Sequence, residues 1–206
     1  MTTGPADRTE LIERVRADLD GGTRGVALWG PPGVGKSWLA ERVAPNATRI
    51  DAELLADLAA IDQALASGGS SVIVDELDGW CDRDADGIAS LLARWLDEGD
   101  RRIVTTHRRR WTPRFARAVA VAPLDPESAM AMFVSEMERL HSPSRLDEAG
   151  QAAVREVLPA LDGLPRAILW AASRWGVFGT DSLVERLRGT VPKALLRDHE
   201  ALVAAL

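Results

Sequence analysis

The segment that most constrains the fold is Gly30 to Ser37, which reads GPPGVGKS. It matches the pattern G-x-x-x-x-G-K-[S/T], in which a glycine-rich loop joins a buried strand to a helix. The surroundings fit, because the apolar run GVALW at 25–29 precedes the segment and the amphipathic stretch SWLAERVA at 37–44 follows it. We therefore predict that residues 30–37 form a phosphate-binding loop, called the phosphate loop below. An ordinary Gly/Pro turn is the alternative.

Each position of the phosphate loop has a physical reason. Glycines let backbone N–H groups converge on phosphate oxygens, and the start of the following helix adds unpaired donors. Lys36, one of only two lysines in the chain, supplies a compact ammonium for the β- and γ-phosphates. Ser37 places a hydroxyl on Mg²⁺. The predicted nucleotide-binding residues of this segment are Gly30, Pro31, Pro32, Gly33, Val34, Gly35, Lys36, Ser37 and Trp38.

Short apolar runs alternate with helical patterns up to about residue 125. The predicted strands are the runs at 25–29, 47–50, 71–75, 102–106 and 118–122. Alternation of strands and helices predicts an α/β fold, here a P-loop NTPase three-layer sandwich with a parallel five-stranded sheet. The connections between its strands should be right-handed crossovers.

The second part of the chain has a different pattern. The stretch DPESAMAMFVSEMERL begins with a helix-start signal at Asp125 and Pro126, and later segments also have helical spacing. We therefore predict a nucleotide-binding α/β core over 1–125 and a helical lid subdomain over 126–206. The stretch 189–206 is either a final helix or the start of a part that continues in a longer protein.

Bulk composition narrows the classes of function. The formal net charge of -6 argues against a general nucleic-acid coat protein, which carries a basic excess. One cysteine, Cys81, provides neither a disulfide framework nor a cysteine-based metal site. The sequence contains no apolar run of about 18 residues and no signal-peptide pattern, so we expect a cytoplasmic protein with no membrane partner.

Two acidic residues follow the third predicted strand. Asp75 ends the run at 71–75, and Glu76 comes next. Ligands of parallel sheets bind beyond the carboxyl ends of the strands, so we expect this pair beside the phosphates. Asp75 would hold Mg²⁺ through water, together with Ser37, and Glu76 would orient or deprotonate the attacking water. A plain acidic loop is the alternative, and Asp78 is expected to be a solvated carboxylate or a helix cap.

The predicted strand at 102–106 ends in hydroxyl-bearing residues and is followed by basic ones. Thr106 is a candidate contact for the γ-phosphate or the attacking water, and two β-branched residues that simply finish a strand are the alternative. Seven arginines lie between residues 101 and 117. They predict a solvated face with phosphate sensing, and nucleic-acid contact through the arginines at 108–110 is the less favoured alternative.

The order of these motifs resembles that of a known family. The phosphate loop, VIVDE, IVTTHR, VAPLDPESAMAMF and LDGLPRAI follow one another as in STAND-type signal-transduction ATPases. These relatives of the AAA+ ATPases include NB-ARC domains and MalT-like regulators. The opening DRTELIERV is similar to the segment that precedes their phosphate loop, and it contributes Arg8 to the predicted nucleotide contacts. The resemblance covers about residues 7–175.

The resemblance implies further nucleotide contacts. Pro165, the last residue of the G-L-P motif, would lie near the adenine. Arg108 would act at the γ-phosphate, although the family usually has its arginine at the position where His107 stands here. Arg166 has the spacing of the second sensor of ordinary AAA+ ATPases, in which an arginine reaches the γ-phosphate from the lid.

These features predict an ATP-binding, Mg²⁺-dependent ATPase module with slow hydrolysis that acts as a signalling or regulatory switch. The resemblance implies ATP and ADP, and the chain has no N/T-K-x-D motif for reading guanine. Expected partners are further copies of the chain and effector or sensor modules. One alternative is an AAA+ loader or remodeller that works as an oligomeric ring, with Arg114 or Arg117 as an arginine finger. The other is a DNA-associated regulator.

Overall fold

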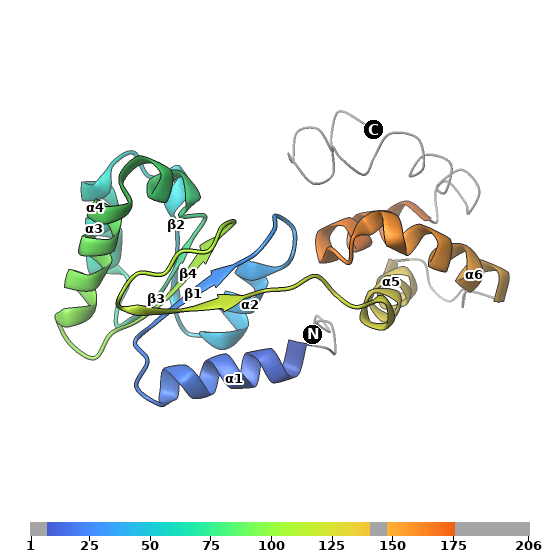
Figure 1. Cartoon of the computed structure of the whole chain (residues 1–206), viewed down its shortest axis with the longest axis horizontal. Coiled ribbons are helices and arrows are strands. Elements are labelled where there is room, and N and C mark those ends of the chain that lie inside the picture. Colours follow the sequence, from blue (N-terminus) through green and yellow to red (C-terminus); the bar gives the residue numbers. More distant parts are fainter. Residues whose placement is uncertain (1–7, 141–147, 176–206) are drawn as a thin grey trace. The chain divides into compact units, whose positions relative to one another are not determined.

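The computed structural model describes residues 8–140 and 148–175 of the 206-residue chain (Figure 1). Within these residues the helices and strands predicted from the sequence can be compared with those observed. The predictions for the end of the chain, including a helix at 189–206, lie outside the described residues.

The chain divides into two compact units. The sheet unit consists of Thr9–Pro31 and Lys36–Val121. The lid unit contains Arg8, Pro32–Gly35 and the residues described from Ala122 on. The phosphate loop therefore contributes residues to both units. The predicted domain boundary at residue 125 stays a prediction.

Five parallel strands form the centre of the sheet unit, in the order β2-β3-β4-β1-β5. Their bounds are β1 Gly25–Trp29, β2 Thr48–Asp51, β3 Ser71–Asp75, β4 Arg102–His107 and β5 Ala116–Ala120. The predicted α/β fold with a parallel five-stranded sheet is thus confirmed. Because all strands run in one direction, their carboxyl ends meet at a single edge of the sheet, and the phosphate loop leaves from that edge.

The edge strand β5 begins two residues before the predicted run at 118–122. Its pairing with β1 starts at Ala116, which stands opposite Gly25, and the Val121 N–H group donates to the carbonyl of Trp29 at 2.8 Å. The bounds of a strand follow its backbone pairing, whereas the sequence pattern reports only the apolar side chains. This difference explains the shift.

Helices cover both faces of the sheet (Figure 1). Their bounds are α1 Thr9–Asp20, α2 Lys36–Val43, α3 Leu58–Ser67 and α4 Asp78–Asp97, with a short 3-10 helix η2 at Ala52–Leu54. Helices α1 and α2 pack on each other and on β1, while α3 and α4 pack together on the other face. This is the three-layer arrangement that the sequence predicts.

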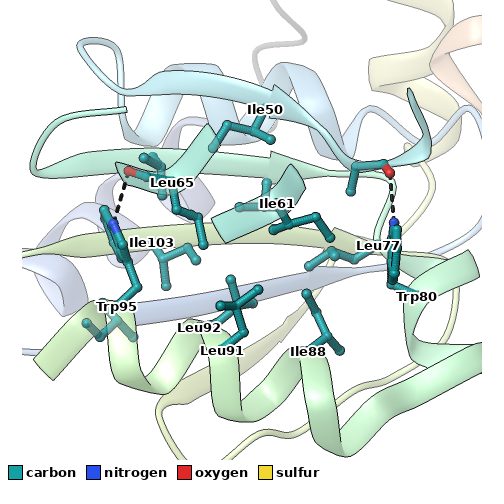
Figure 2. Close-up of a cluster of buried hydrophobic side chains, with 14 residues drawn as sticks. Ile50, Ile61, Leu65, Leu77, Trp80, Ile88, Leu91, Leu92, Trp95 and Ile103 are labelled. Atoms are coloured by element: carbon teal, nitrogen blue, oxygen red, sulfur yellow. Dashed lines mark hydrogen bonds between the residues drawn. The ribbon is translucent and has the colours of Figure 1, made fainter. Parts of the chain in front are cut away.

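A continuous apolar cluster fills the space between α3, α4 and the sheet (Figure 2). It includes Val72, Val74 and Ile103 from the strands, Ile61 and Leu65 from α3, and Ile88 and Leu92 from α4. Two tryptophans of α4 close its ends with hydrogen bonds to backbone carbonyls. The Trp80 Nε1–H group donates to Ala52 at 2.8 Å, and the Trp95 Nε1–H group donates to Leu65 at 3.1 Å. Each indole thus buries its ring without leaving its donor unpaired.

From Pro126 on, the described part of the lid unit is mainly helical. Helix α5 spans Pro126–Leu140, α6 spans Glu148–Val157, η3 spans Leu158–Leu161, and a further helix covers 165–175. The predicted start of α5 is confirmed, because the Asp125 carboxylate accepts the N–H groups of Glu127 and Ser128 at 2.8 and 2.9 Å. Among residues 8–140 and 148–175, no helix has the length and apolarity needed to cross a membrane.

The apolar cluster yields a stability prediction. Leu92 is fully buried, so Leu92→Ala should lower the free energy of unfolding by about 3 kcal/mol, through lost burial and the cavity left behind. Leu54 is 81% exposed, and Leu54→Ala should change the same quantity by less than about 0.5 kcal/mol. Denaturant unfolding of both variants measures the difference, and equal losses would contradict the assignment of the core.

Candidate functional site

The phosphate loop joins β1 to α2 in the way its pattern predicts. The Gly30 N–H group donates to the carbonyl of His107 at the end of β4, at 3.1 Å, and α2 begins at Lys36. Among the other loop residues, Pro31 and Pro32 are exposed and Val34 is fully buried. The loop is therefore anchored at the carboxyl edge of the sheet, where a helix N-terminus can offer free N–H donors.

Lys36 is buried, yet its ammonium lies among polar atoms. The Nζ atom donates to the carbonyls of Gly30 and Pro31 at 3.0 and 3.2 Å. Burial lowers the pKa of Lys36, and the negative charges of Glu76 and Asp78 act in the opposite direction. An ammonium has three donors, so these two contacts leave one N–H group for an anion.

Asp75 is a fully buried carboxylate of the site, with no exposed surface. The Ser37 hydroxyl at the start of α2 donates to Asp75 Oδ1 at 3.0 Å. The Thr106 hydroxyl on β4 donates to the same oxygen, and the Arg49 Nη2 group on β2 donates to Oδ2 at 2.6 Å. The structure thus brings together Ser37 and Asp75, the two residues predicted to hold Mg²⁺.

Thr106 lies between the two acidic residues. It is fully buried, and its Oγ1 atom accepts the Glu76 N–H group at 3.0 Å while its own proton goes to Asp75. The single hydroxyl proton is already used in this network. Thr106 therefore positions the two acidic residues, and its predicted contact with the γ-phosphate or the attacking water stays a prediction.

Glu76 adopts a left-handed backbone conformation with φ of 54°, which residues other than glycine rarely adopt. Its hydrogen bond to Thr106 holds this conformation. Burial raises the pKa of the Glu76 carboxyl, and the nearby charge of Lys36 lowers it by a smaller amount. Strained backbone at the end of a strand, combined with a perturbed carboxyl, is common at functional sites.

The two residues after Thr106 have different surroundings. His107 is buried and packs against Trp111, with 4.7 Å between the ring centroids, and burial lowers its pKa to about 4. Arg108 is half-exposed, and its guanidinium lies 4.0 Å from Glu76 and 3.9 Å from Asp78. Of these two residues, Arg108 therefore presents the charge that a phosphate sensor needs. The Asp78 carboxylate accepts the Arg108 N–H group at 2.7 Å, so Asp78 holds this turn in place.

Within the lid unit, Arg8 and the 165–175 helix lie against the tip of the phosphate loop. The Arg166 N–H group donates to the Gly33 carbonyl at 3.1 Å. Gly35 has a φ of 93°, and a Cβ atom there would lie 3.1 Å from Arg8 Nη1 and 4.0 Å from Pro165. Arg8 is buried and donates to the carbonyl of Ala122 at 2.9 Å. The three predicted contacts from this part of the chain are thus gathered around the loop tip.

Gly163 explains why the G-L-P motif begins with glycine. Its φ is 64°, its carbonyl accepts the Leu124 N–H group at 2.8 Å, and a Cβ atom would lie only 2.3 Å from the Leu124 carbonyl oxygen. Residue 124 belongs to the segment that leads from β5 to α5. Backbone contact this close requires glycine, and it places Pro165 at the first turn of the 165–175 helix, as predicted.

Several other candidates have partners within the sheet unit. The Arg42 guanidinium lies 5.1 Å from the ring centroid of Trp38. Arg117 pairs with Asp18 at 2.5 Å, and Arg109 pairs with Asp82 at 3.3 Å. Arg114 is exposed. The predicted arginine finger and the predicted nucleic-acid contact stay predictions, and the acidic partners of the 108–110 segment reduce its positive field.

Sequence reasoning missed Arg49. It lies on the short edge strand β2, and its Nη1 group also donates to Glu41 of α2 at 3.0 Å. The register of β2 and β3 places Arg49 opposite Ile73, two positions before Asp75, so Arg49 and Asp75 share a face of the sheet. No local pattern marks this residue, because its role depends on how two strands align.

Solved structures share this fold. The chain is similar to a Thermotoga maritima RuvB mutant at 17% identity, over 89% of this chain and 68% of that one, with a TM-score of 0.65. It is similar to a Walker-type ATPase of Pyrococcus abyssi at 16% identity, over 88% and 71%, with a TM-score of 0.64. It also resembles the FIGL-1 AAA domain in complex with ADP at 14% identity, over 98% and 80%, with a TM-score of 0.56.

No protein-family model and no curated protein matches the sequence. At identities this low, the structural likeness establishes the fold alone. The chain therefore has the fold of AAA+-type P-loop ATPase domains. The STAND subtype implied by the order of the motifs stays a prediction.

The buried His107 predicts a pH dependence of stability. Its folded pKa of about 4 lies below the ordinary value of 6.5, so the unfolded chain binds a proton in this interval that the folded chain does not. This histidine should therefore remove up to about 3 kcal/mol of stability as the pH falls from 6.5 to 4. Denaturant unfolding of wild type and His107→Asn across this range tests the effect, and parallel curves would contradict it.

Proposed function

We propose that the chain is the nucleotide-binding module of a P-loop ATPase, which binds ATP with Mg²⁺ at the phosphate loop and hydrolyses it slowly. One observation carries the proposal. The Ser37 hydroxyl donates to the buried Asp75 carboxylate at 3.0 Å, and Ser37 directly follows Lys36 in the sequence. A hydroxyl that gives its proton to a carboxylate keeps its oxygen lone pairs available for a hard cation.

The residues of the sheet unit suit the negative charge of a triphosphate and the metal ion bound to it. Lys36 has one N–H group beyond its contacts to Gly30 and Pro31, and the N-terminus of α2 adds backbone donors. Mg²⁺ bound through Ser37, and through water to Asp75, would neutralise charge on the phosphates. Charge compensation by donors already in place is the main contribution of the protein to phosphoryl transfer.

Glu76 is the residue best suited to handle the attacking water. Burial raises its pKa, which makes its carboxylate a stronger base than an exposed glutamate. Its backbone is fixed through Thr106, and the Arg108 guanidinium lies 4.0 Å from its Oε2 atom. The Arg108 guanidinium, beside Glu76 and Asp78, is our candidate for a contact to the γ-phosphate. We propose roles for Thr106 in positioning, for Glu76 at the water and for Arg108 at the phosphate.

The proposed switch rests on contacts inside the lid unit. The Arg166 N–H group binds the Gly33 carbonyl, and the Arg8 guanidinium lies beside Gly35. A nucleotide that fills the phosphate loop would alter the surroundings of these residues, and Pro165 would then adjoin the base. Nucleotide state would thereby bias the lid unit and whatever effector or sensor module is attached to it.

A working AAA+ ATPase that assembles into a ring is the second candidate. Arg117 is paired with Asp18, whereas Arg114 is exposed on the segment before β5, so Arg114 is the better candidate for an arginine that acts on a neighbouring copy. This function requires ATP turnover per molecule that rises with protein concentration and falls in Arg114→Ala. Turnover that is independent of concentration would exclude it.

The proposed roles of Lys36 and Glu76 predict different variant behaviour. Glu76→Gln should bind ATP within about threefold of wild type while its hydrolysis rate falls by about a hundredfold, because the base is lost and the binding groups remain. Lys36→Ala should lose most ATP affinity. Calorimetric titration with ATP and single-turnover phosphate release measure the two quantities.

A matched control and a competing nucleotide complete the test. Lys193→Ala removes the other lysine of the chain and should leave ATP affinity unchanged. GTP should bind more weakly than ATP. Equal ATP affinity in wild type and Lys36→Ala would overturn the proposed site, and preferential binding of GTP would overturn the proposed nucleotide.

A further inference from the structure

The carboxylate of Asp75 carries a buried charge whose compensation is visible in the structure. Asp75 has no exposed surface, and two of its three hydrogen-bond donors, Ser37 and Thr106, are neutral hydroxyl groups. Within the described part of the chain, its ion-pair partner is Arg49, at 2.6 Å. A buried carboxylate without a cation is costly, so Arg49 supplies the charge that the two hydroxyls cannot.

The side chain of Arg49 is anchored in two directions. One guanidinium nitrogen contacts the fully buried Asp75, and another contacts the half-exposed Glu41 on α2. The Arg49 side chain itself is 48% exposed. It therefore reaches the carboxylate from the solvent side, and Glu41 provides a second carboxylate on which the same guanidinium can remain.

We propose that Arg49 is a built-in counter-cation of Asp75 that sets how strongly the phosphate loop takes up a divalent cation with its nucleotide. This inference rests on the proposed function. Ser37, the residue suited to hold the metal, donates a hydrogen bond to Oδ1 of Asp75, and Arg49 donates one to Oδ2. The guanidinium cancels one negative charge of this cluster and thereby weakens its attraction for Mg²⁺.

The proposal separates two effects of opposite sign. Removing the positive charge of Arg49 leaves a buried carboxylate unpaired, so the protein without metal loses stability. The same change raises the negative charge near Ser37, so less Mg²⁺ is needed to support nucleotide binding. A residue that served only to hold β2 and β3 in place would lower stability without lowering the need for metal.

The test uses the full chain and ADP as the probe. Calorimetric titrations of ADP are run in EDTA and at a series of MgCl₂ concentrations for wild type, Arg49→Gln, Arg49→Lys and Glu41→Gln. Arg49→Gln should reach half of its Mg²⁺-dependent gain in ADP affinity at about tenfold less MgCl₂ than wild type. Its thermal midpoint in EDTA should be lower. Arg49→Lys and Glu41→Gln should stay within about twofold of the wild-type MgCl₂ requirement.

Each outcome decides a separate point. Wild type that binds ADP, with Arg49→Gln needing the same or more MgCl₂, overturns the inference and leaves the proposed function intact. Wild type that binds no ADP at any MgCl₂ concentration overturns both. If Arg49→Gln does not fold, Arg49→Met decides by the same titration, because it also removes the charge: about tenfold less MgCl₂ than wild type supports the inference, and the same or a larger requirement overturns it.

Discussion

The site depends on one buried carboxylate. Asp75 ends β3 with no exposed surface, and its two oxygens accept protons from the first turn of α2, from β4 and from β2. A buried anion is tolerated only when its acceptor positions are filled and its charge is compensated. The network therefore joins three neighbouring strands, β2, β3 and β4, to the start of the helix that follows the phosphate loop. A change in any donor affects the fold and the site together.

The same network explains how the structure sustains strain next to the carboxylate. Glu76 is held with a φ of 54°, a conformation that costs about 1–2 kcal/mol for a residue with a Cβ atom. The Thr106 hydroxyl accepts the N–H group of this strained residue and passes its own proton to Asp75. One buried hydroxyl thereby forms hydrogen bonds with both acidic residues at the end of β3. Stability and the proposed chemistry draw on the same few atoms.

Local sequence patterns predict much of this structure. The features that they miss depend on how strands distant in the sequence align with one another. Consecutive residues define both the strand–loop–helix around Lys36 and the acidic end of β3. The strands, and the proximity of Ser37 to Asp75, could therefore be predicted. Arg49 reaches Asp75 only through the register of β2 against β3, which no short pattern encodes. The extent of β5 was misplaced by two residues because its pairing with β1 begins before its apolar run.

Glycine has two distinct uses in the lid unit. At Gly35 a positive φ and the nearby Arg8 guanidinium leave little room for a side chain. Without a side chain at this position, a phosphate can approach the backbone N–H groups closely. At Gly163 the constraint is the Leu124 backbone, whose carbonyl oxygen would lie only 2.3 Å from a Cβ atom. The second contact has no part in phosphate chemistry, yet it fixes where the 165–175 helix begins, and that helix donates to the Gly33 carbonyl through Arg166. The segment leading to α5 and the tip of the phosphate loop are thus joined through two backbone hydrogen bonds and the residues between them. In the proposed switch, a change at the phosphate loop would reach the segment leading to α5 through these contacts.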